Sequence, residues 1–325
     1  MNAKQSDCEL AEKVARSPFL NPLIVGMTVI SLVAIPLLVS LLHRVISTAT
    51  YHINTRILFI FHVVCLILHC VARINQNVFD LLHYNREEGC NLLRTEWNCF
   101  LLRAPSVFFF EIACLSPLFI CIERTIASKR LEVYESSGHR IGVIFCLVQI
   151  IITLLFTLIH YLDTPFHSGL ERIYCTTSTV KTRTRSLFVF GFLAASQIVA
   201  VVWFQCIRRS NRRRNVELVL TSKYQLDEIL RSAHVLAPFV YTSFVVCLIF
   251  LGALELVVAY TEVIAPEDFP LFVEAAFLCP VYAFLLPVLI YYCNKVLERR
   301  MRRSIDTQMN MPYDEYRERL EGLWK

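Results

Sequence analysis

The chain has 325 residues, of which 56% are hydrophobic and 18% are charged, and its formal net charge is +5. This composition, with a mean hydropathy of +0.52, is too apolar and too poor in charge for an ordinary soluble domain. Seven spans of roughly 20 residues would use a little under half of the chain, which leaves no room for a large soluble domain.

The first segment, residues 1–21, carries several charged side chains before Pro18 and has no apolar region of the kind found in cleavable signal peptides. We therefore expect the first apolar run to act as the targeting signal and to remain in the membrane. Fixed-period repeats, low-complexity tracts and glycine/serine linkers are absent from the sequence, so we expect one domain.

Seven long apolar runs follow, rich in Leu, Ile, Val and Phe. Most are close to the length that crosses about 30 Å of hydrocarbon as a helix. Backbone groups in lipid must be hydrogen-bonded within their own element, which favours helices. The sequence predicts an all-α, seven-transmembrane helix bundle over residues 22–293, with spans at 22–42, 57–72, 104–122, 141–162, 187–207, 235–259 and 270–293.

Lysine and arginine are unevenly divided between the two sides of this bundle. The first, third and fifth connections and the C-terminal tail hold 21 of them, whereas the N-terminus and the other connections hold 11. The side richer in basic residues is normally cytosolic. The sequence therefore predicts an extracellular N-terminus and a cytoplasmic C-terminus.

The cysteines agree with this orientation. Nine of the thirteen lie in predicted spans, where cysteine behaves as a small hydrophobic residue. The other four, Cys8, Cys90, Cys99 and Cys175, all fall on the predicted outer side, where an oxidising environment permits disulfides. Four cysteines allow three pairings. We favour Cys99–Cys175, which would hold the loop between spans four and five over the mouth of the bundle, and then Cys8–Cys90; free thiols are the alternative.

Span three ends in Glu123-Arg124-Thr125, with a carboxylate beside a guanidinium where the helix leaves the membrane. An arginine there can pair with a carboxylate in one state and turn to a partner in another, as a signalling switch requires. The alternative is a cation that merely anchors the helix. Cys99 and Arg124 are 25 residues apart, about 37 Å along a helix, so they mark opposite ends of one crossing.

Two further segments belong to the predicted cytoplasmic face. Arginines that include Arg212, Arg213 and Arg214 follow span five, and residues 215–235 have the spacing of a cytosolic extension of helix six. These arginines could contact a G protein or anionic lipid headgroups. Residues 294–325 are expected to form a short amphipathic helix along the inner leaflet, at 295–305, followed by a polar tail.

Ionisable groups within spans are costly, so each is a functional candidate. Three carboxylates lie in the predicted outer half of the spans: Glu111, Glu255 and Glu274. Hydrogen-bond donors are expected at a similar depth: His69, Arg73, Arg103 and His160. We expect a ligand pocket there, with Glu111, Glu255, His69 and Arg103 as its first candidates. The alternative is that Glu255 and Glu274 reach the interface and that Glu111 pairs with Arg103, Arg73 or a histidine.

Other classes of protein fit less well. The sequence has no metal-binding His/Cys motif, nucleophile elbow or phosphate-binding glycine loop, so it predicts no enzyme, no metal, no cofactor and no nucleic-acid partner. A polytopic transporter or channel is the serious alternative. It would favour an inverted repeat and charges in the inner half, and neither is visible.

The Cys99 to Glu-Arg-Thr separation resembles rhodopsin-like G-protein-coupled receptors, although Cys-Trp-x-Pro and Asn-Pro-x-x-Tyr are missing. A closer resemblance is to nematode serpentine chemoreceptors of class AB in the Sra superfamily. It is carried by residues 51–58, 68–74, 98–103, 122–128 and 222–228. This resemblance implies a chemosensory receptor in the plasma membrane of sensory cilia that binds an odorant or pheromone-like small molecule and signals to a heterotrimeric G protein.

Overall fold

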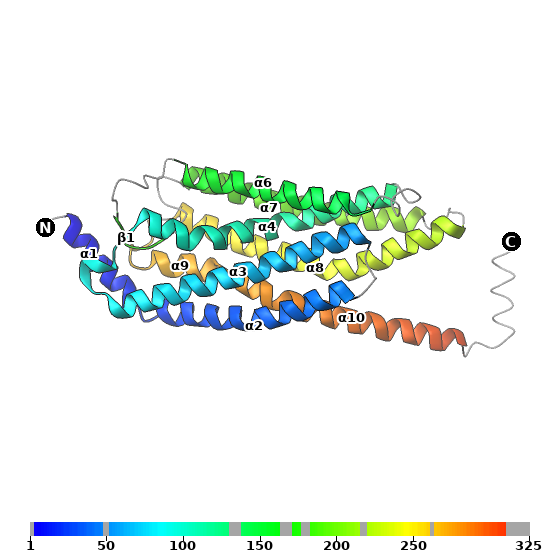
Figure 1. Ribbon diagram of the computed structural model, residues 1–325, viewed down its shortest axis with the longest axis horizontal. Helices are drawn as coiled ribbons and strands as arrows, with labels where there is room; N and C mark the ends of the chain where they lie inside the picture. The colour runs from blue at the N-terminus through cyan, green and yellow to red at the C-terminus, as the bar shows by residue number, and fades with distance from the viewer. Residues whose placement is uncertain are drawn as a thin grey trace.

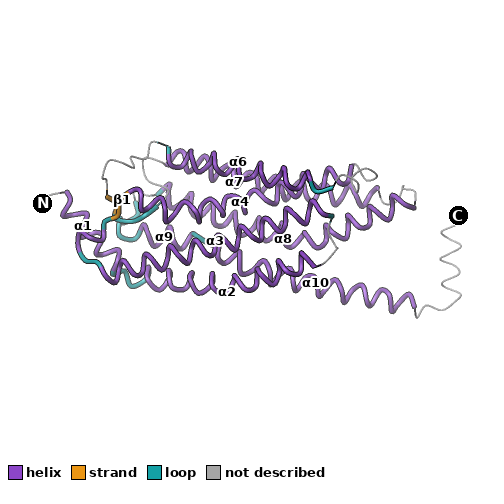
Figure 2. Tube along the Cα trace, viewed as in Figure 1, coloured by secondary structure: helices purple, strands orange, loops and turns teal. Residues whose placement is uncertain are grey.

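The computed structural model describes residues 3–47, 52–129, 138–162, 171–176, 183–214, 220–260 and 263–309. Long helices dominate (Figures 1 and 2). In chain order the elements are α1 (Ala3–Ala15), α2 (Leu20–Ser47), α3 (Ile53–Arg86), η1 (Gly89–Leu92), β1 (Arg94–Thr95), α4 (Glu96–Lys129), α6 (Arg140–Tyr161), β2 (Glu171–Arg172), α7 (Arg183–Arg214), α8 (Leu220–Ala259), α9 (Phe269–Ala276) and α10 (Cys279–Met309).

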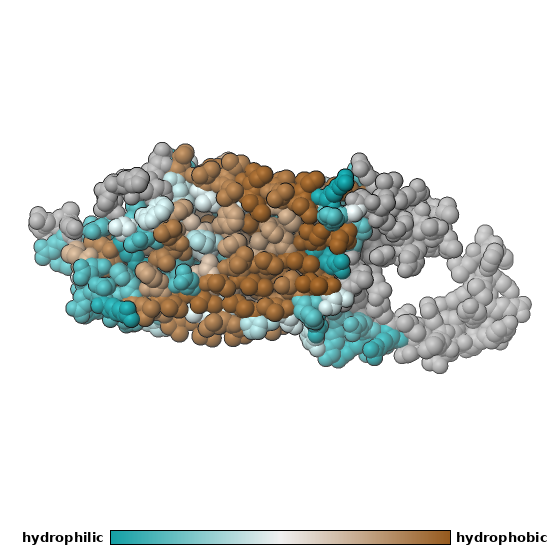
Figure 3. Space-filling view, in the orientation of Figure 1, coloured by the Kyte–Doolittle hydropathy of each residue, from teal (hydrophilic) through white to brown (hydrophobic). Residues whose placement is uncertain are grey.

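Within the described residues, seven helical segments are long and apolar enough to cross a membrane, which confirms the predicted fold class. Six are the helices α2, α3, α4, α6, α7 and α8. The seventh combines α9 and the first part of α10, which are separated by a break at Phe277 and Leu278. Around the middle of the molecule, Figure 3 shows a broad hydrophobic band with hydrophilic residues toward both ends, as a bilayer-spanning bundle requires.

Most helices extend beyond the apolar runs that predicted them. The second run covers 57–72, whereas α3 continues to Arg86. Hydropathy locates the residues that face lipid, but a helix can continue with polar residues when neighbouring helices bury and pair them. This is the case for the second half of α3, in which Arg73, Gln76 and Asp80 are buried.

Helix α4 is the central element of the bundle. It packs against α3, α6, α7 and α8, while α2 packs between α3 and α10. Buried residues occur on every side of α4, in contrast to α6, which presents a row of exposed apolar residues. Two prolines, Pro105 and Pro117, lie within α4. Helix α4 therefore contacts four of the other spanning helices.

Two disulfides define one end of the bundle, called here the disulfide end. They join Cys8 to Cys90 and Cys99 to Cys175, which are the pairs favoured from the sequence. The opposite end, where α7 finishes in arginines, is called the basic end. In Figure 1, α1 and β1 lie at the disulfide end and the last turns of α10 project from the basic end.

The disulfide end is covered by the N-terminal helix and by residues 171–176, the described part of the loop between α6 and α7. The first bridge ties α1 to η1, and Ala11, Val14 and Ala15 of α1 are buried there. In the loop, β2 pairs antiparallel with β1, which directly precedes α4. The second bridge then joins Cys175 to the first turn of α4, so the loop is held at two points.

At the basic end, two predicted segments are helical. The helix of span six begins at Leu220, so much of the predicted 215–235 extension belongs to α8. Residues 295–305 are also helical, but they continue α10 without a break to Met309. The expected helix along the inner leaflet is thus in line with span seven. The tail at 310–325 lies outside the described residues.

A close contact between α3 and α6 leads to a first prediction. The Gly142 amide donates to Asn54 Oδ1 at 3.0 Å, and a Cβ on Gly142 would stand 2.9 Å from the Asn54 carbonyl oxygen. Gly142→Ala is therefore expected to cost about 1–3 kcal/mol through overpacking and to lower the melting temperature of the purified protein. Gly252→Ala is the matched control, because a Cβ there meets nothing within 4 Å; equal melting temperatures for the two variants would contradict this.

Candidate functional site

A stripe of polar residues runs along the face of α3 that points into the bundle. His69, Arg73, Gln76 and Asp80 follow one another at intervals of three or four residues, which places them on one face of the helix. All four are buried, with exposed fractions of 0–2%. Buried polar groups require partners. These partners come from α4, from α9 and from Arg94 of β1.

Glu274 of α9 is the centre of this network. Its carboxylate accepts from Arg73, from Arg103 at 2.7 Å and from the Tyr174 hydroxyl, while Arg103 also donates to the Tyr174 oxygen. The Glu274 side chain is buried, so it does not reach the membrane interface as the alternative from sequence allowed. One carboxylate thus joins α3, α4, α9 and the α6–α7 loop.

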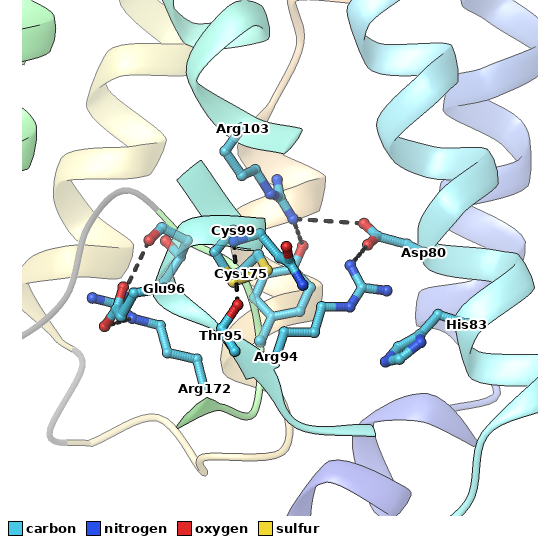
Figure 4. The surroundings of a disulfide bond; sticks show 12 residues. Asp80, His83, Arg94, Thr95, Glu96, Cys99, Arg103, Arg172 and Cys175 are labelled. Carbon is cyan, nitrogen blue, oxygen red and sulfur yellow. Dashed lines mark hydrogen bonds and ion pairs between the residues drawn. A yellow bond between two sulfur atoms is a disulfide. The ribbon is translucent and has the colours of Figure 1, made fainter. Parts of the chain in front are cut away.

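Asp80 and Arg94 extend the network toward the surface of the disulfide end. Arg94 forms an ion pair with Asp80, whose other oxygen is 4.0 Å from Arg103 (Figure 4). The hydrogen-bond pattern orients the Gln76 amide so that its oxygen accepts from Arg73 at 2.9 Å and from Arg103 at 2.8 Å. Among these described residues, three guanidinium groups face two carboxylates, so the network carries one excess positive charge.

Tyr174 reaches the network because its neighbour Cys175 is bonded to α4. The phenol is 8% exposed, and burial raises its pKa well above the usual value. It therefore remains a neutral hydrogen-bond donor to Glu274. A second pair beside the disulfide, Arg172 with Glu96, holds the strand β2 against the start of α4 (Figure 4).

A small cavity lies directly below this network. Arg103, Ser106 and Thr176 contribute its polar lining, and four phenylalanines, Phe110, Phe190, Phe250 and Phe277, contribute most of the rest. Its volume is about 30 Å³, room for about one water molecule. Small-molecule sites are usually several hundred Å³ in volume, so a molecule larger than water would fit here only if side chains moved.

Three of these phenylalanines connect the helices that such a ligand would separate. Phe110 of α4 and Phe250 of α8 make an edge contact with ring centres 4.5 Å apart, and Phe277 lies 5.0 Å from Phe250. Phe277 also stands at the break between α9 and α10 and lies beneath the Arg73 guanidinium, 4.5 Å from ring centre to cation. The aromatic cluster therefore links the charged network to α8.

The structure brings some of the predicted ligand residues together and separates others. Arg103 lines the cavity, and His69, with Nδ1 donating to the Ser106 carbonyl at 2.8 Å, stacks on Phe277 beside it. Glu111 is fully buried and lies 3.1 Å from His160, so it pairs with a histidine. Glu255 of α8 is only half-buried. Neither Glu111 nor Glu255 lines the cavity.

At the basic end of α4, Arg124 is held in a compact contact. It donates through Nε to Glu123 at 2.7 Å and through Nη2 to Glu123 at 2.8 Å and to the Thr55 hydroxyl of α3. Thr55 in turn donates to the Glu123 carboxylate, at 2.9–3.0 Å. All three residues are buried. A restrained arginine of this kind can be released to another partner.

The remaining coupling candidates are only partly described. Arg212, Arg213 and Arg214 form the end of α7, and their side chains lie outside the described part of the structure. Nearby, Ser128 of α4 donates to Asn211 of α7 at 2.6 Å, so the two helices are joined just before these arginines.

Sequence reasoning missed four members of the charged network: Gln76, Asp80, Arg94 and Tyr174. Gln76 and Asp80 lie beyond the predicted end of span two, although their spacing from His69 and Arg73 was a usable signal. Arg94 and Tyr174 come from connections between helices. Only the pairing of β1 with β2 and the Cys99–Cys175 bridge bring them to the site.

The fold and the two buried polar networks describe a seven-span membrane protein. A family model described as "Serpentine type 7TM GPCR receptor class ab chemoreceptor" matches residues 5–325. The chain belongs to this family, as its resemblance to class AB receptors indicated.

Three curated relatives from Caenorhabditis elegans match most of this chain. Serpentine receptor class alpha/beta-14 is 28% identical over 69% of this chain and 60% of its own length. Serpentine receptor class alpha-39 is 22% identical over 86% of this chain and 76% of its own, and serpentine receptor class beta-3 is 24% identical over 83% and 78%.

The Cys99–Cys175 bridge leads to a second prediction. Cys99→Ser and Cys175→Ser are each expected to cost about 2–5 kcal/mol and to lower surface delivery equally, because each breaks the same bond. The double variant should be no worse than either single one. Surface labelling of tagged receptors measures this, and additive losses would contradict a shared bridge.

Proposed function

We propose that this protein is a chemosensory G-protein-coupled receptor of the plasma membrane, in sensory cilia by family analogy. Its disulfide end faces outside, where a small molecule binds in the outer half of the bundle. Its basic end faces the cytosol and meets a heterotrimeric G protein. Family membership favours this function over the transporter or channel that the sequence also allowed.

The observation that carries the proposal is the placement of two buried polar networks on one helix. Arg103 and Arg124 both lie on α4, 21 residues apart, which corresponds to about 31 Å. One network borders a cavity at the disulfide end, and the other restrains an arginine at the basic end. A ligand that changes the first network acts on the element that carries the second.

Helix α8 provides the second connection between the ends. Phe250 lies at the cavity, Pro238 lies within the same helix, and the helix continues to Leu220. Opening the cavity moves Phe250 away from Phe110 and so shifts α8 against α4. The proline weakens the backbone ladder between these two parts and is a natural bending point. Movement of the 220–235 segment would expose a surface to the G protein.

The test is ligand-dependent G-protein recruitment in cells, with a chemically broad panel of small molecules and surface expression measured in parallel. The proposal expects at least one compound to recruit a G protein to the receptor. Full surface expression without recruitment by any compound, across representatives of all G-protein classes, would contradict it.

A further inference from the structure

The cavity beside Arg103 has an uneven chemical lining that restricts the class of ligand. Its apolar side consists largely of phenylalanines from α4, α7, α8 and the α9–α10 break. Its polar side is formed by Arg103, Ser106 and Thr176, and Arg103 is 5% exposed. Such a site matches a molecule that has an apolar body and one polar head.

The charge of the head follows from the network around Arg103. Arg73, Arg94 and Arg103 face Asp80 and Glu274, so one positive charge is not balanced by a carboxylate among the described residues. In addition, Arg73 Nε and Arg94 Nη2 are buried and have no hydrogen-bond partner in the described structure. A buried charge without a counterion is costly, and an anion that enters the site removes this cost.

Glu274 indicates how an anion would be received. It is an internal carboxylate that already takes two arginines and a tyrosine from three different elements. Arginine binds carboxylates of ligands and of side chains with the same planar geometry. A ligand carboxylate at Arg103 therefore competes with Glu274, and α9 carries Glu274 directly before the break in span seven.

From the cavity lining and the charge balance we infer that the ligand of this receptor is a small amphiphilic anion, an organic carboxylate with an aromatic or aliphatic body. The carboxylate binds Arg103, and the body spreads Phe110, Phe250 and Phe277. This inference rests on the proposed function, since it specifies the ligand class for the same site. It also links binding to movement, because the body separates α8 from α4 while the head loosens α9.

The experiment compares 3-phenylpropanoate with 3-phenylpropanamide, which has the same body and no charge, and with acetate, which has the charge and no body. Each is titrated against the purified full-length receptor in an uncharged detergent, and the rise in melting temperature gives its Kd. A charged hydrogen-bonded contact predicts a Kd about tenfold to a hundredfold weaker for the amide. Acetate should give no comparable rise at equal concentration.

Variants assign the two parts of the ligand to their contacts. Leu254 also lines the cavity, so Leu254→Phe should fill it without changing the charged network. In this variant 3-phenylpropanoate should no longer raise the melting temperature. Arg103→Gln should remove the preference for the carboxylate. Arg172→Gln is the matched control, because Arg172 is ion-paired with Glu96 near the same disulfide but does not line the cavity, and it should keep the preference.

Several results would overturn the inference. Equal binding of the acid and the amide would show that the site does not require an anionic head. Equal binding of acetate would show that it does not require an apolar body. If 3-phenylpropanoate does not raise the melting temperature, or raises it equally in Leu254→Phe, the cavity is not the binding site. If Arg103→Gln does not fold, the ligand class and the binding site are still tested by comparing the three probes on the unmodified receptor and on Leu254→Phe. G-protein recruitment by a neutral compound would refute this ligand class and leave the receptor function intact.

Discussion

Arg124→Lys is expected to reduce ligand-dependent G-protein recruitment by at least about tenfold while the receptor remains at the cell surface. Lysine keeps the charge that balances the buried Glu123, so the bundle stays folded, but it lacks the planar fork that contacts two acceptors at once. Arg124→Ala would instead leave the Glu123 carboxylate buried without its cation, and a loss of folding could then be mistaken for a loss of coupling. Recruitment normalised to surface receptor is the measurement.

The partner residue Thr55 tests the same contact from the other side. Thr55→Val removes the hydroxyl that accepts from Arg124 and donates to Glu123, worth about 0.5–1.5 kcal/mol to the restrained state. Basal recruitment should therefore rise between about twofold and tenfold. Thr125→Val is the control, since the Thr125 hydroxyl donates to Cys121 in its own helix. If Arg124→Lys signals normally and Thr55→Val has unchanged basal activity, this contact does not act as a switch.

Glu274→Ala is expected to cost about 3–5 kcal/mol and to remove most receptor from the cell surface. The alanine leaves Arg73 and Arg103 facing each other, buried and without their shared carboxylate. Glu274→Gln should lose less, because the amide oxygen still accepts a hydrogen bond. Surface labelling and the melting temperature of the purified protein measure both variants.

Glu255→Ala is the matched control for this prediction. Both carboxylates were expected in the outer half of the bundle from the sequence, but Glu255 is half-buried and Glu274 is 1% exposed. This difference in burial predicts a small loss of stability and surface receptor for Glu255→Ala and a large loss for Glu274→Ala. Equal, small effects would mean that the carboxylate of Glu274 is solvated and that the charged network is not formed.

The bundle could be predicted from sequence because lipid imposes one solution on long apolar runs. The disulfide pairs favoured from the sequence also occur in the structure, since the alternating direction of the spans puts all four cysteines at the same end of the bundle. The ends of the helices could not be predicted in this way. The α3 residues Gln76 and Asp80 look like a loop by hydropathy, and only their pairing with α4 and Arg94 keeps them in a buried helix.

The composition of the outer site was only partly predictable for a related reason. Arg103, Glu274 and Arg73 were recognised as costly charges, but their mutual pairing joins three separate helices, and hydropathy does not show which charges meet. Tyr174 depends on a disulfide and a two-residue strand. Glu111 was one of the first candidates for ligand contact, whereas the structure pairs it with His160 and places Arg103 at the cavity.

The orientation of the chain underlies both the ligand site and the coupling site, and it can be measured directly. Epitope tags at each terminus are probed with antibodies in intact and in permeabilised cells. The proposed orientation predicts that the N-terminal tag is labelled in intact cells and the C-terminal tag only after permeabilisation. Labelling of the C-terminal tag in intact cells would place the Arg124 contact outside the cell and would contradict the receptor mechanism.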